Sequence, residues 1–221
     1  ALVLTGMLML GALAGCGQSG SSEGEGGQEE KMIKIGVVQL LEHAALDASY
    51  QGFVDGLKEA GFEEGKNIVI DFNNAQGEQA NCQTIAHKLV NDQSDLILAI
   101  ATPAAQAVAN VTQDIPVLFT AVTDPVDAKL VADYDAPGGN VTGSSDLTPV
   151  KEQIALIKQI VPEVQSIGML YSSSEANSVF QINLAKAAAE ELGIAFVDAS
   201  ISNSNEIQQV IESVVDSVDA M

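Results

Sequence analysis

Small polar residues follow two apolar runs in the middle of the chain, and their types suit the binding of a small charged ligand. Thr102 and Pro103 come directly after the run 96–101, and the segment from Thr120 to Pro125 ends the run 115–122. Runs of consecutive apolar residues favour parallel strands that are buried on both faces. Thr102 is a good N-cap and Pro103 a good first helical residue, so free backbone N–H groups at that helix start would attract a carboxylate.

The elements that must position these residues follow from the apolar periodicity. Strands are expected at 32–40, 68–72, 96–101, 115–122, 167–171 and 194–199, with an extended piece at 140–145. Helices are expected along the stripe Leu46, Tyr50, Phe53 and Leu57 up to Gly61, over 79–91, in the Ala-rich segment after Pro103, over 149–161, up to Leu192, and around 207–218. This alternation predicts an α/β fold with helices on both faces of a parallel sheet and a ligand at the carboxyl ends of the strands.

Composition narrows the classes of function. The formal net charge of −21 disfavours nucleic acid as a partner. The chain has no HExxH, GxSxG or GxxxxGK[ST] motif, and its two histidines, His43 and His87, lack clustered metal-ligating neighbours. We therefore expect neither an enzyme, nor a metal site, nor a cofactor. A DNA-binding repressor would need a basic helix-turn-helix header, which the start of this chain does not provide.

The first 31 residues read as a lipoprotein leader and a tether. Residues 1–16 are apolar like a signal peptide whose charged start is missing, and Leu13-Ala14-Gly15-Cys16 resembles the bacterial lipobox, which implies lipid attachment at Cys16. Residues 17–31 are rich in Gly, Ser and Glu and predict a flexible tether. The remaining cysteine, Cys82, is expected to be a small buried residue on a helix.

The composition restarts after residue 145, which predicts two α/β lobes at 32–145 and 146–221. The second lobe would have only two or three strands, and the rhythm predicts the start of another strand at Asp219 to Met221. A sheet cut at that point would leave an edge unprotected. We therefore expect the sequence to be a fragment whose second lobe is incomplete.

Besides the lipobox, the chain contains the ordered segments VVQLLEHAALDASYQGFVDGLKEAGFEEGKN, LILAIATPAAQAVAN, IPVLFTAVTDPV, PGGNVTGSSDLTPVKEQ and LYSSSEANS. Together these segments resemble the substrate-binding lipoproteins of ABC importers, and among them the group for aromatic amino acids such as tryptophan and tyrosine. This resemblance implies two Rossmann-like lobes of the periplasmic-binding-protein type that close around a ligand. It also implies a protein held by lipid on the extracytoplasmic face of the cell membrane, with an ABC permease as partner.

The resemblance places candidate ligand-binding residues at the strand ends of both lobes. In the first lobe they are Glu42, His43, Thr102, Pro103, Thr120, Thr123 and Asp124, followed by Ser145 and Asp146 at the crossover. In the second lobe they are Tyr171, Ser173, Glu175, Ala176, Asn177 and Ser178. An amino-acid ligand needs donors for its carboxylate, a carboxylate for its ammonium group and an apolar slot for its side chain.

These roles have open alternatives. The ligand carboxylate would lie near Thr102 or Ser173–Ser178, and its amine would pair with Asp124, Asp146 or Glu175. Tyr171 is either an aromatic wall of the slot or a core residue at a strand end. Thr102 is compatible with being a helix cap and a ligand contact at once, and Asp124 suits an Asx turn as well.

The remaining candidates and the function have alternatives too. Ser145 and Asp146 suit ordinary turns, Glu42 and His43 suit a solvated loop, and helix capping is an alternative use of the serines in SSSEANS. A purine or a short peptide would also fit an apolar slot with polar anchors. The alternative function is a lipoprotein that senses a small metabolite and presents it to a membrane receptor.

Overall fold

The computed structural model describes residues 32–221, whose strands form two separate parallel sheets. The expected signal peptide (1–16), Cys16 and the tether (17–31) lie outside the described residues. Strands and helices alternate along most of the described chain, which confirms the α/β class. The division into lobes at residues 145 and 146 stays a prediction.

The first sheet has five strands, and every neighbouring pair is parallel. They are β1 (Ile33–Gln39), β2 (Ile68–Asn74), β3 (Leu96–Ile100), β4 (Val117–Val122) and β5 (Val141–Ser145). Their order in the sheet is β2-β1-β3-β4-β5. The apolar runs of β1 and β3 are buried because both strands lie inside the sheet and have neighbours on either side.

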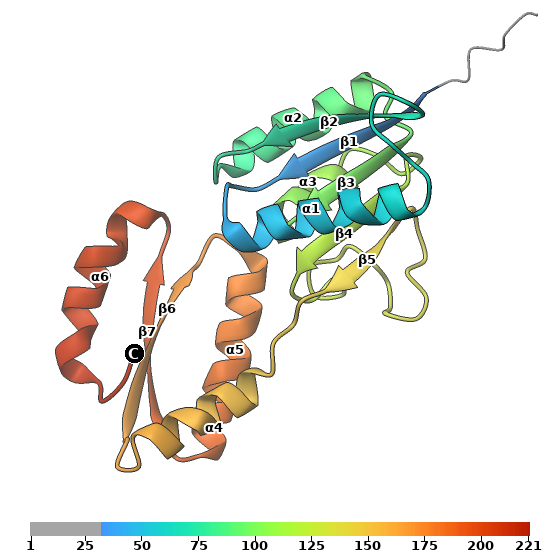
Figure 1. Ribbon diagram of the computed structural model, residues 1–221. Coiled ribbons are helices and arrows are strands. Elements are labelled where there is room, and N and C mark those ends of the chain that lie inside the picture. The colour runs from blue at the N-terminus through green and yellow to red at the C-terminus, as the bar shows by residue number, and fades with distance from the viewer. Residues whose placement is uncertain (1–31) are drawn as a thin grey trace, which may run out of the picture. The chain divides into compact units, whose positions relative to one another are not determined.

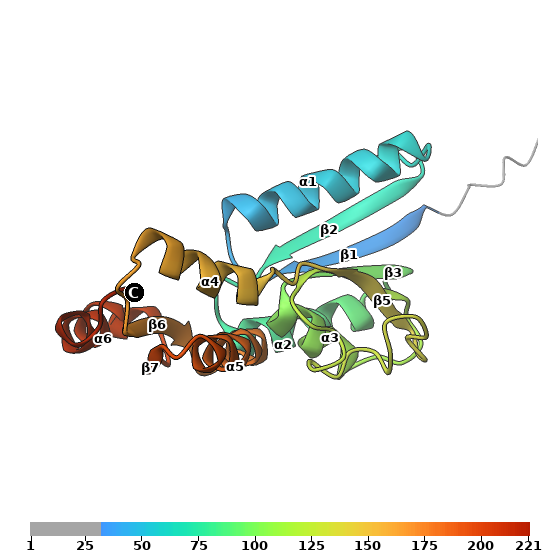
Figure 2. The same cartoon turned by 90° about the horizontal axis from the view of Figure 1, so that it is seen from below.

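Helices cover both faces of this sheet, as Figures 1 and 2 show. α1 (Ala44–Glu59) lies on one face, and α2 (Gln79–Asn91) and α3 (Thr102–Ala109) lie on the other. The two faces have separate cores, because α2 and α3 share one apolar cluster while α1 packs on another. The apolar stripe predicted for α1 packs against the cluster on its own face, through Leu46, Tyr50, Phe53 and Leu57.

The sequence predicts the segment of β5 as an extended piece that leads out of the first unit, but the structure makes it a strand of the first sheet. It pairs in parallel with β4 and forms an edge of the sheet. The register between the two strands shifts between Phe119 and Val122, where Ala121 has a positive φ of 54°. Irregularities of this kind bend a strand and re-aim its side chains. Here the shift lies at the carboxyl end of β4, next to the predicted site residues.

The second sheet pairs β6 (Ser166–Ser172) with β7 (Ala195–Ile201). Ala220 forms a parallel bridge to Ile167, at the place where the sequence predicts the start of another strand. The accompanying helices are α4 (Val150–Ile160), α5 (Ala176–Glu191) and α6 (Ile207–Val214), with short 3-10 turns η1 (Ser204–Glu206) and η2 (Val215–Ser217). α4 and α5 share a buried apolar cluster with β6, so the helices hold this sheet through its core.

Candidate functional site

The strand order of the first sheet places a topological switch point at the carboxyl ends of β1 and β3. From β1 the chain continues to β2 on one side, whereas β3, β4 and β5 follow on the other side. The loops after β1 and β3 therefore leave the sheet on opposite faces, towards α1 and α3. Gln39, the last residue of β1, pairs with Ile100, the last residue of β3. Ligands of open α/β sheets bind at such a switch point.

Thr102 lies at this switch point, one position further into α3 than the sequence predicts. The N-cap is Ala101, so Thr102 and Pro103 are the first and second helical residues. Ala101 has φ 86° and ψ 153°, a backbone conformation that costs energy for a residue with a β-carbon. It offers no side-chain acceptor to the helix, so the first N–H groups of α3 lack a side-chain cap.

The hydroxyl of Thr102 is buried without a partner. Its residue is 2% exposed, and within residues 32–221 Oγ1 makes no hydrogen bond. A buried polar atom of this kind costs free energy, and native proteins rarely keep one without a use. Together with the uncapped N–H groups of α3, the hydroxyl forms a cluster of donors that suits a carboxylate.

Gln39 is a candidate site residue that sequence reasoning missed. It is fully buried, and its Nε2 donates to Leu41 O at 2.9 Å and to Asp47 Oδ1 at 2.7 Å. Its Oε1 is buried and has no hydrogen-bond partner in the described part of the chain. The available signal was a single amide side chain at the end of a strand whose residues from Ile35 to Val38 are apolar.

α5 carries the third orphaned polar atom that the described residues contain. Asn177 lies in the first turn of α5, and its Oδ1 is buried without a hydrogen-bond partner. The N-cap of α5 is Glu175, whose side chain makes no capping hydrogen bond. The serines before the helix do not cap it either, because Ser173 Oγ donates to Ile201 O at 3.0 Å and Ser172 Oγ pairs with Ser174 Oγ. Capping therefore does not explain this serine-rich segment.

The other second-lobe candidates gather at the same helix start. Tyr171 is the penultimate residue of β6 and is half-buried, whereas Ser173, directly after this strand, is exposed. Ala176 and Ser178 flank Asn177 in the first turn of α5, and both are half-buried. The structure thus brings these residues together, while their contact with a ligand stays a prediction.

Two hydrogen bonds connect the first sheet's strand-end region with α5 and the loop before it. Gln181 Nε2 donates to Thr123 Oγ1 at 3.4 Å, and Gln79 Nε2 donates to Ser174 O at 2.8 Å. Thr123 is 5% exposed and follows β4 directly. Thr123, directly after β4, and Gln79, the first residue of α2, therefore contact the second half of the chain, through a side chain of α5 and a backbone carbonyl of the loop before it.

Other candidates are engaged in local structure. Asp124 Oδ1 accepts from the N–H groups of Val126 and Asp127, both at 2.9 Å, so the Asx turn that Asp-Pro favours is formed. Slight desolvation of the largely exposed Tyr134 and a hydrogen bond to this carboxylate raise the pKa of Tyr134. Ser145 Oγ donates to Thr123 O at 2.6 Å. These local bonds make Asp124 and Ser145 weaker candidates for ligand contacts.

Four further candidates have local hydrogen bonds or are exposed. Thr120 Oγ1 accepts from Ser144 Oγ at 3.3 Å. His43 is the N-cap of α1, and its Nδ1 accepts from Ala45 N at 3.2 Å. Glu42 and Asp146 are exposed, as is His43. The solvated-loop alternative for Glu42 and His43 therefore agrees with their exposure, and neither meets the orphaned atoms through a hydrogen bond in the described structure.

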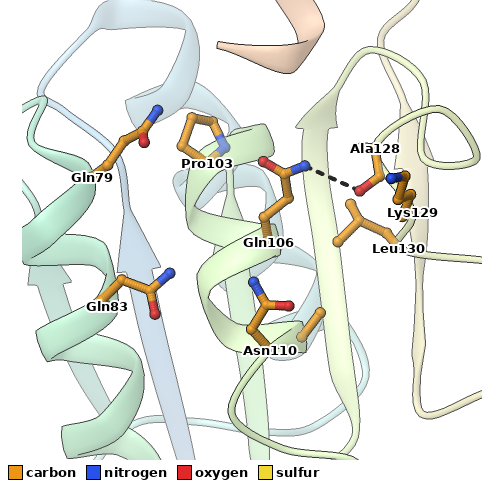
Figure 3. Close-up of a pocket in the computed structure, with 9 residues that line it drawn as sticks. Gln79, Gln83, Pro103, Gln106, Asn110, Ala128, Lys129 and Leu130 are labelled. Carbon is orange, nitrogen blue, oxygen red and sulfur yellow. Dashed lines mark hydrogen bonds between the residues drawn. The ribbon is translucent and has the colours of Figure 1, made fainter. Parts of the chain in front are cut away.

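A separate hollow of about 390 Å³ lies along α2, α3 and the segment after β4 (Figure 3). Four amide side chains line it, and that of Gln106 donates to Ala128 O at 3.1 Å. Its lining contains Pro103 but none of the three orphaned polar atoms. Residues 32–221 hold no cluster of three His, Cys, Asp or Glu side chains that suits a metal ion, and none of their helices has the length and apolarity of a membrane span.

Comparison with known proteins gives the family. Residues 34–221 match the family model described as ABC transporter substrate binding protein. The tyrosine-binding protein of Clostridioides difficile (strain R20291) is 41% identical over 224 residues, a match that covers 100% of this chain and 65% of the relative. Proteins of this family bind a solute rather than transform it.

Two solved structures share the fold. A conserved domain protein from Vibrio cholerae is 46% identical with a TM-score of 0.83, over 86% of this chain and 64% of that one. An ABC domain from Streptococcus pneumonia, solved in complex with L-Trp, is 44% identical with a TM-score of 0.82, over 85% and 63%. The chain therefore spans less than two thirds of the length of these relatives.

Proposed function

The chain belongs to the family of ABC transporter substrate-binding proteins, and we propose that the complete protein captures an aromatic amino acid and delivers it to an ABC permease. The similarity to a tyrosine-binding protein and to a domain solved with L-Trp supports this ligand class. Both relatives exceed 40% identity, and the match to the tyrosine-binding protein covers the whole of this chain.

The observation that carries the proposal is the position of the orphaned polar atoms. All three belong to residues at or after the carboxyl end of a parallel strand: Gln39 is the last residue of β1, Thr102 follows β3, and Asn177 follows β6. A zwitterionic ligand brings both donors and acceptors, so it can satisfy such atoms at once. In our assignment its carboxylate binds Thr102 Oγ1 and the N–H groups that open α3.

Delivery to a permease requires a ligand-dependent change. In our proposal, binding favours a closed arrangement in which α5 and the loops after β3 and β4 hold the ligand together. The ligand must bind the closed state more tightly than the open one, because equal affinity for both would shift no population. The hydrogen bonds Gln181–Thr123 and Gln79–Ser174 are contacts that such a change would make or strengthen.

We also propose that lipid on Cys16 anchors the protein to the extracytoplasmic face of the cell membrane. The lipobox at Leu13 to Cys16 supports this anchor, and the Gly/Ser/Glu tract after it would hold the binding domain away from the lipid. Metabolic labelling with a radioactive or alkyne fatty acid tests the anchor. Wild-type protein should carry the label and Cys16→Ser should not; label on both variants would refute attachment at Cys16.

A thermal-shift screen of the complete protein without residues 1–16 tests the ligand class. Ligands that bind only the folded state raise the melting temperature as their concentration rises. We expect a shift with tryptophan, tyrosine or phenylalanine and none with the other amino acids, purines or short peptides. A shift confined to one of those other solutes would correct the substrate, and no shift with any would argue for the sensing role instead.

A further inference from the structure

We propose that Gln39 accepts a hydrogen bond from the ammonium group of the ligand, and that Asp47 acts through Gln39 as a positioning residue that supplies compensating negative charge. This inference rests on the proposed function and deepens it. It adds two residues from β1 and α1 to a site whose other candidates follow β3, β4 and β6. Neither residue stands out in the sequence as a ligand contact.

The two hydrogen bonds of Gln39 fix the direction of its amide. Both N–H bonds have acceptors, Leu41 O at 2.9 Å and Asp47 Oδ1 at 2.7 Å. A flipped amide would turn its oxygen towards two acceptors and is disfavoured. Oε1 therefore remains a pure acceptor in a fully buried residue and lacks a donor among residues 32–221. An acceptor held in this way is prepared for a donor that arrives with the ligand.

The neighbouring strand indicates which donor this is. Thr102 Oγ1 and the N–H groups that open α3 are donors and suit a carboxylate. β1 and β3 are adjacent, with Gln39 paired to Ile100, and adjacent strands lie about 4.8 Å apart. In an α-amino acid the carboxylate and the ammonium group share one carbon atom. A ligand whose carboxylate lies at α3 therefore brings its ammonium group close to the end of β1.

Asp47 supplies the negative charge that the neutral amide of Gln39 lacks. A buried ammonium group needs a compensating charge, and Gln39 carries none. The carboxylate of Asp47 accepts one of its N–H bonds, which draws electron density towards Oε1 and strengthens it as an acceptor. Asp124, another candidate for this role, already accepts two backbone N–H bonds with its Oδ1. Asp47 is exposed, so its effect should be the smaller one because solvent screens it.

The test compares ligands with and without an ammonium group. We would measure dissociation constants of the complete protein by calorimetry for L-tryptophan, L-tyrosine and indole-3-propionate, which lacks the amine. Gln39→Met keeps the length of the side chain and removes the acceptor. It should weaken binding of the two amino acids by between about tenfold and a hundredfold and leave indole-3-propionate unchanged.

Matched variants separate this role from a structural one. Gln51→Met removes an exposed glutamine of α1 that also donates to a carboxylate, Asp55 Oδ1 at 2.9 Å, and it should change no affinity. Asp47→Asn keeps an acceptor for Gln39 and removes the charge, so it should weaken amino-acid binding about two- to fivefold and again spare indole-3-propionate. Because Asp47 is exposed, this variant keeps the inference testable if Gln39→Met does not fold.

The outcomes are distinct. An unchanged affinity of Gln39→Met for the amino acids, or an equal loss for indole-3-propionate, would overturn the inference while wild-type binding leaves the proposed function intact. If the wild-type protein binds neither L-tryptophan nor L-tyrosine, the proposed function fails and this inference fails with it.

Discussion

Gly143 of β5 lies so close to Phe119 of β4 that a β-carbon on Gly143 would stand 2.0 Å from the Phe119 carbonyl oxygen. The Phe119 ring would lie 2.7 Å from the same carbon. This approach occurs where the register of the two strands shifts, directly before the loop that carries Thr123 and Asp124. The tight contact thus fixes the edge of the sheet beside the candidate site.

We expect Gly143→Ala to lower the free energy of unfolding by at least about 2 kcal/mol, because backbone must move to admit the methyl group. Gly139→Ala is the matched control: it lies in the turn before β5 and has open space where its β-carbon would be. Urea unfolding of both variants measures the difference. Equal stability of the two would show that β5 does not approach β4 as closely as described.

The apolar elements of this fold were predictable from sequence, since burial on both faces of a sheet leaves a clear pattern. The bounds of α2 were predicted to the residue, because Cys82, Ala86 and Leu89 repeat on one side of a helix between polar ends. β5 was predicted only as an extended piece, because its pairing depends on the register shift in β4 and not on its own residues.

The candidate site was only partly predictable, because its key features are tertiary. Thr102 was proposed from its position after a strand, and Asn177 from the family resemblance. The positive φ of Ala101, which moves Thr102 into the helix, depends on neighbouring strands rather than on the residue type. Gln39 was missed because a sequence does not show that its Nε2 has hydrogen-bond partners while its Oε1 has none. One of those partners, Asp47, lies eight residues away on α1.

Thr102→Val should separate binding from stability. The substitution removes a buried hydroxyl that has no partner, so the unliganded protein should keep or gain stability, by up to about 2 kcal/mol. Binding of L-tryptophan should weaken about tenfold or more if the hydroxyl contacts the ligand carboxylate. Calorimetry and thermal unfolding measure the two effects.

Thr112→Val is the control for Thr102→Val, because it should lower the stability and leave ligand binding unchanged. Thr112 is also buried, but its Oγ1 accepts from the N–H groups of Asp114 and Ile115. Its loss should cost about 1 kcal/mol or more of stability and leave the dissociation constant unchanged. A variant Thr102→Val that is as destabilised as Thr112→Val, with unchanged binding, would contradict the role that we assign to Thr102.

Cys82 should be inert towards thiol reagents in the folded protein. Its side chain is fully buried on α2, as predicted, and burial raises the pKa of the thiol to about 11. The reactive thiolate is therefore scarce at neutral pH, and the reagent has no access to it. In protein without residues 1–16, Ellman's reagent should react only after unfolding in urea. Fast reaction of the native protein at a pH of about 8 would show that α2 opens readily.

Asp219 should stabilise the second sheet in a pH-dependent way. The backbone N–H of Gln165 and the hydroxyl and N–H of Ser166 donate to its carboxylate and lower its pKa below the ordinary value of 3.8. A lowered folded-state pKa gives stability that is fully present above that ordinary value and is lost as the pH falls through the lower one. Asp219→Asn should therefore reduce the free energy of unfolding at a pH of about 6, and the difference from wild type should shrink towards a pH of about 2.

Asp216→Asn is the control for this measurement, because Asp216 is an exposed neighbour that makes no hydrogen bond to Ser166 in the described structure. It also removes one negative charge, so it corrects for the change in net charge. Urea unfolding from a pH of about 2 to about 7 compares the three proteins. A loss of stability for Asp219→Asn that matches the control at every pH would mean that the carboxylate does not hold the start of β6 through these hydrogen bonds.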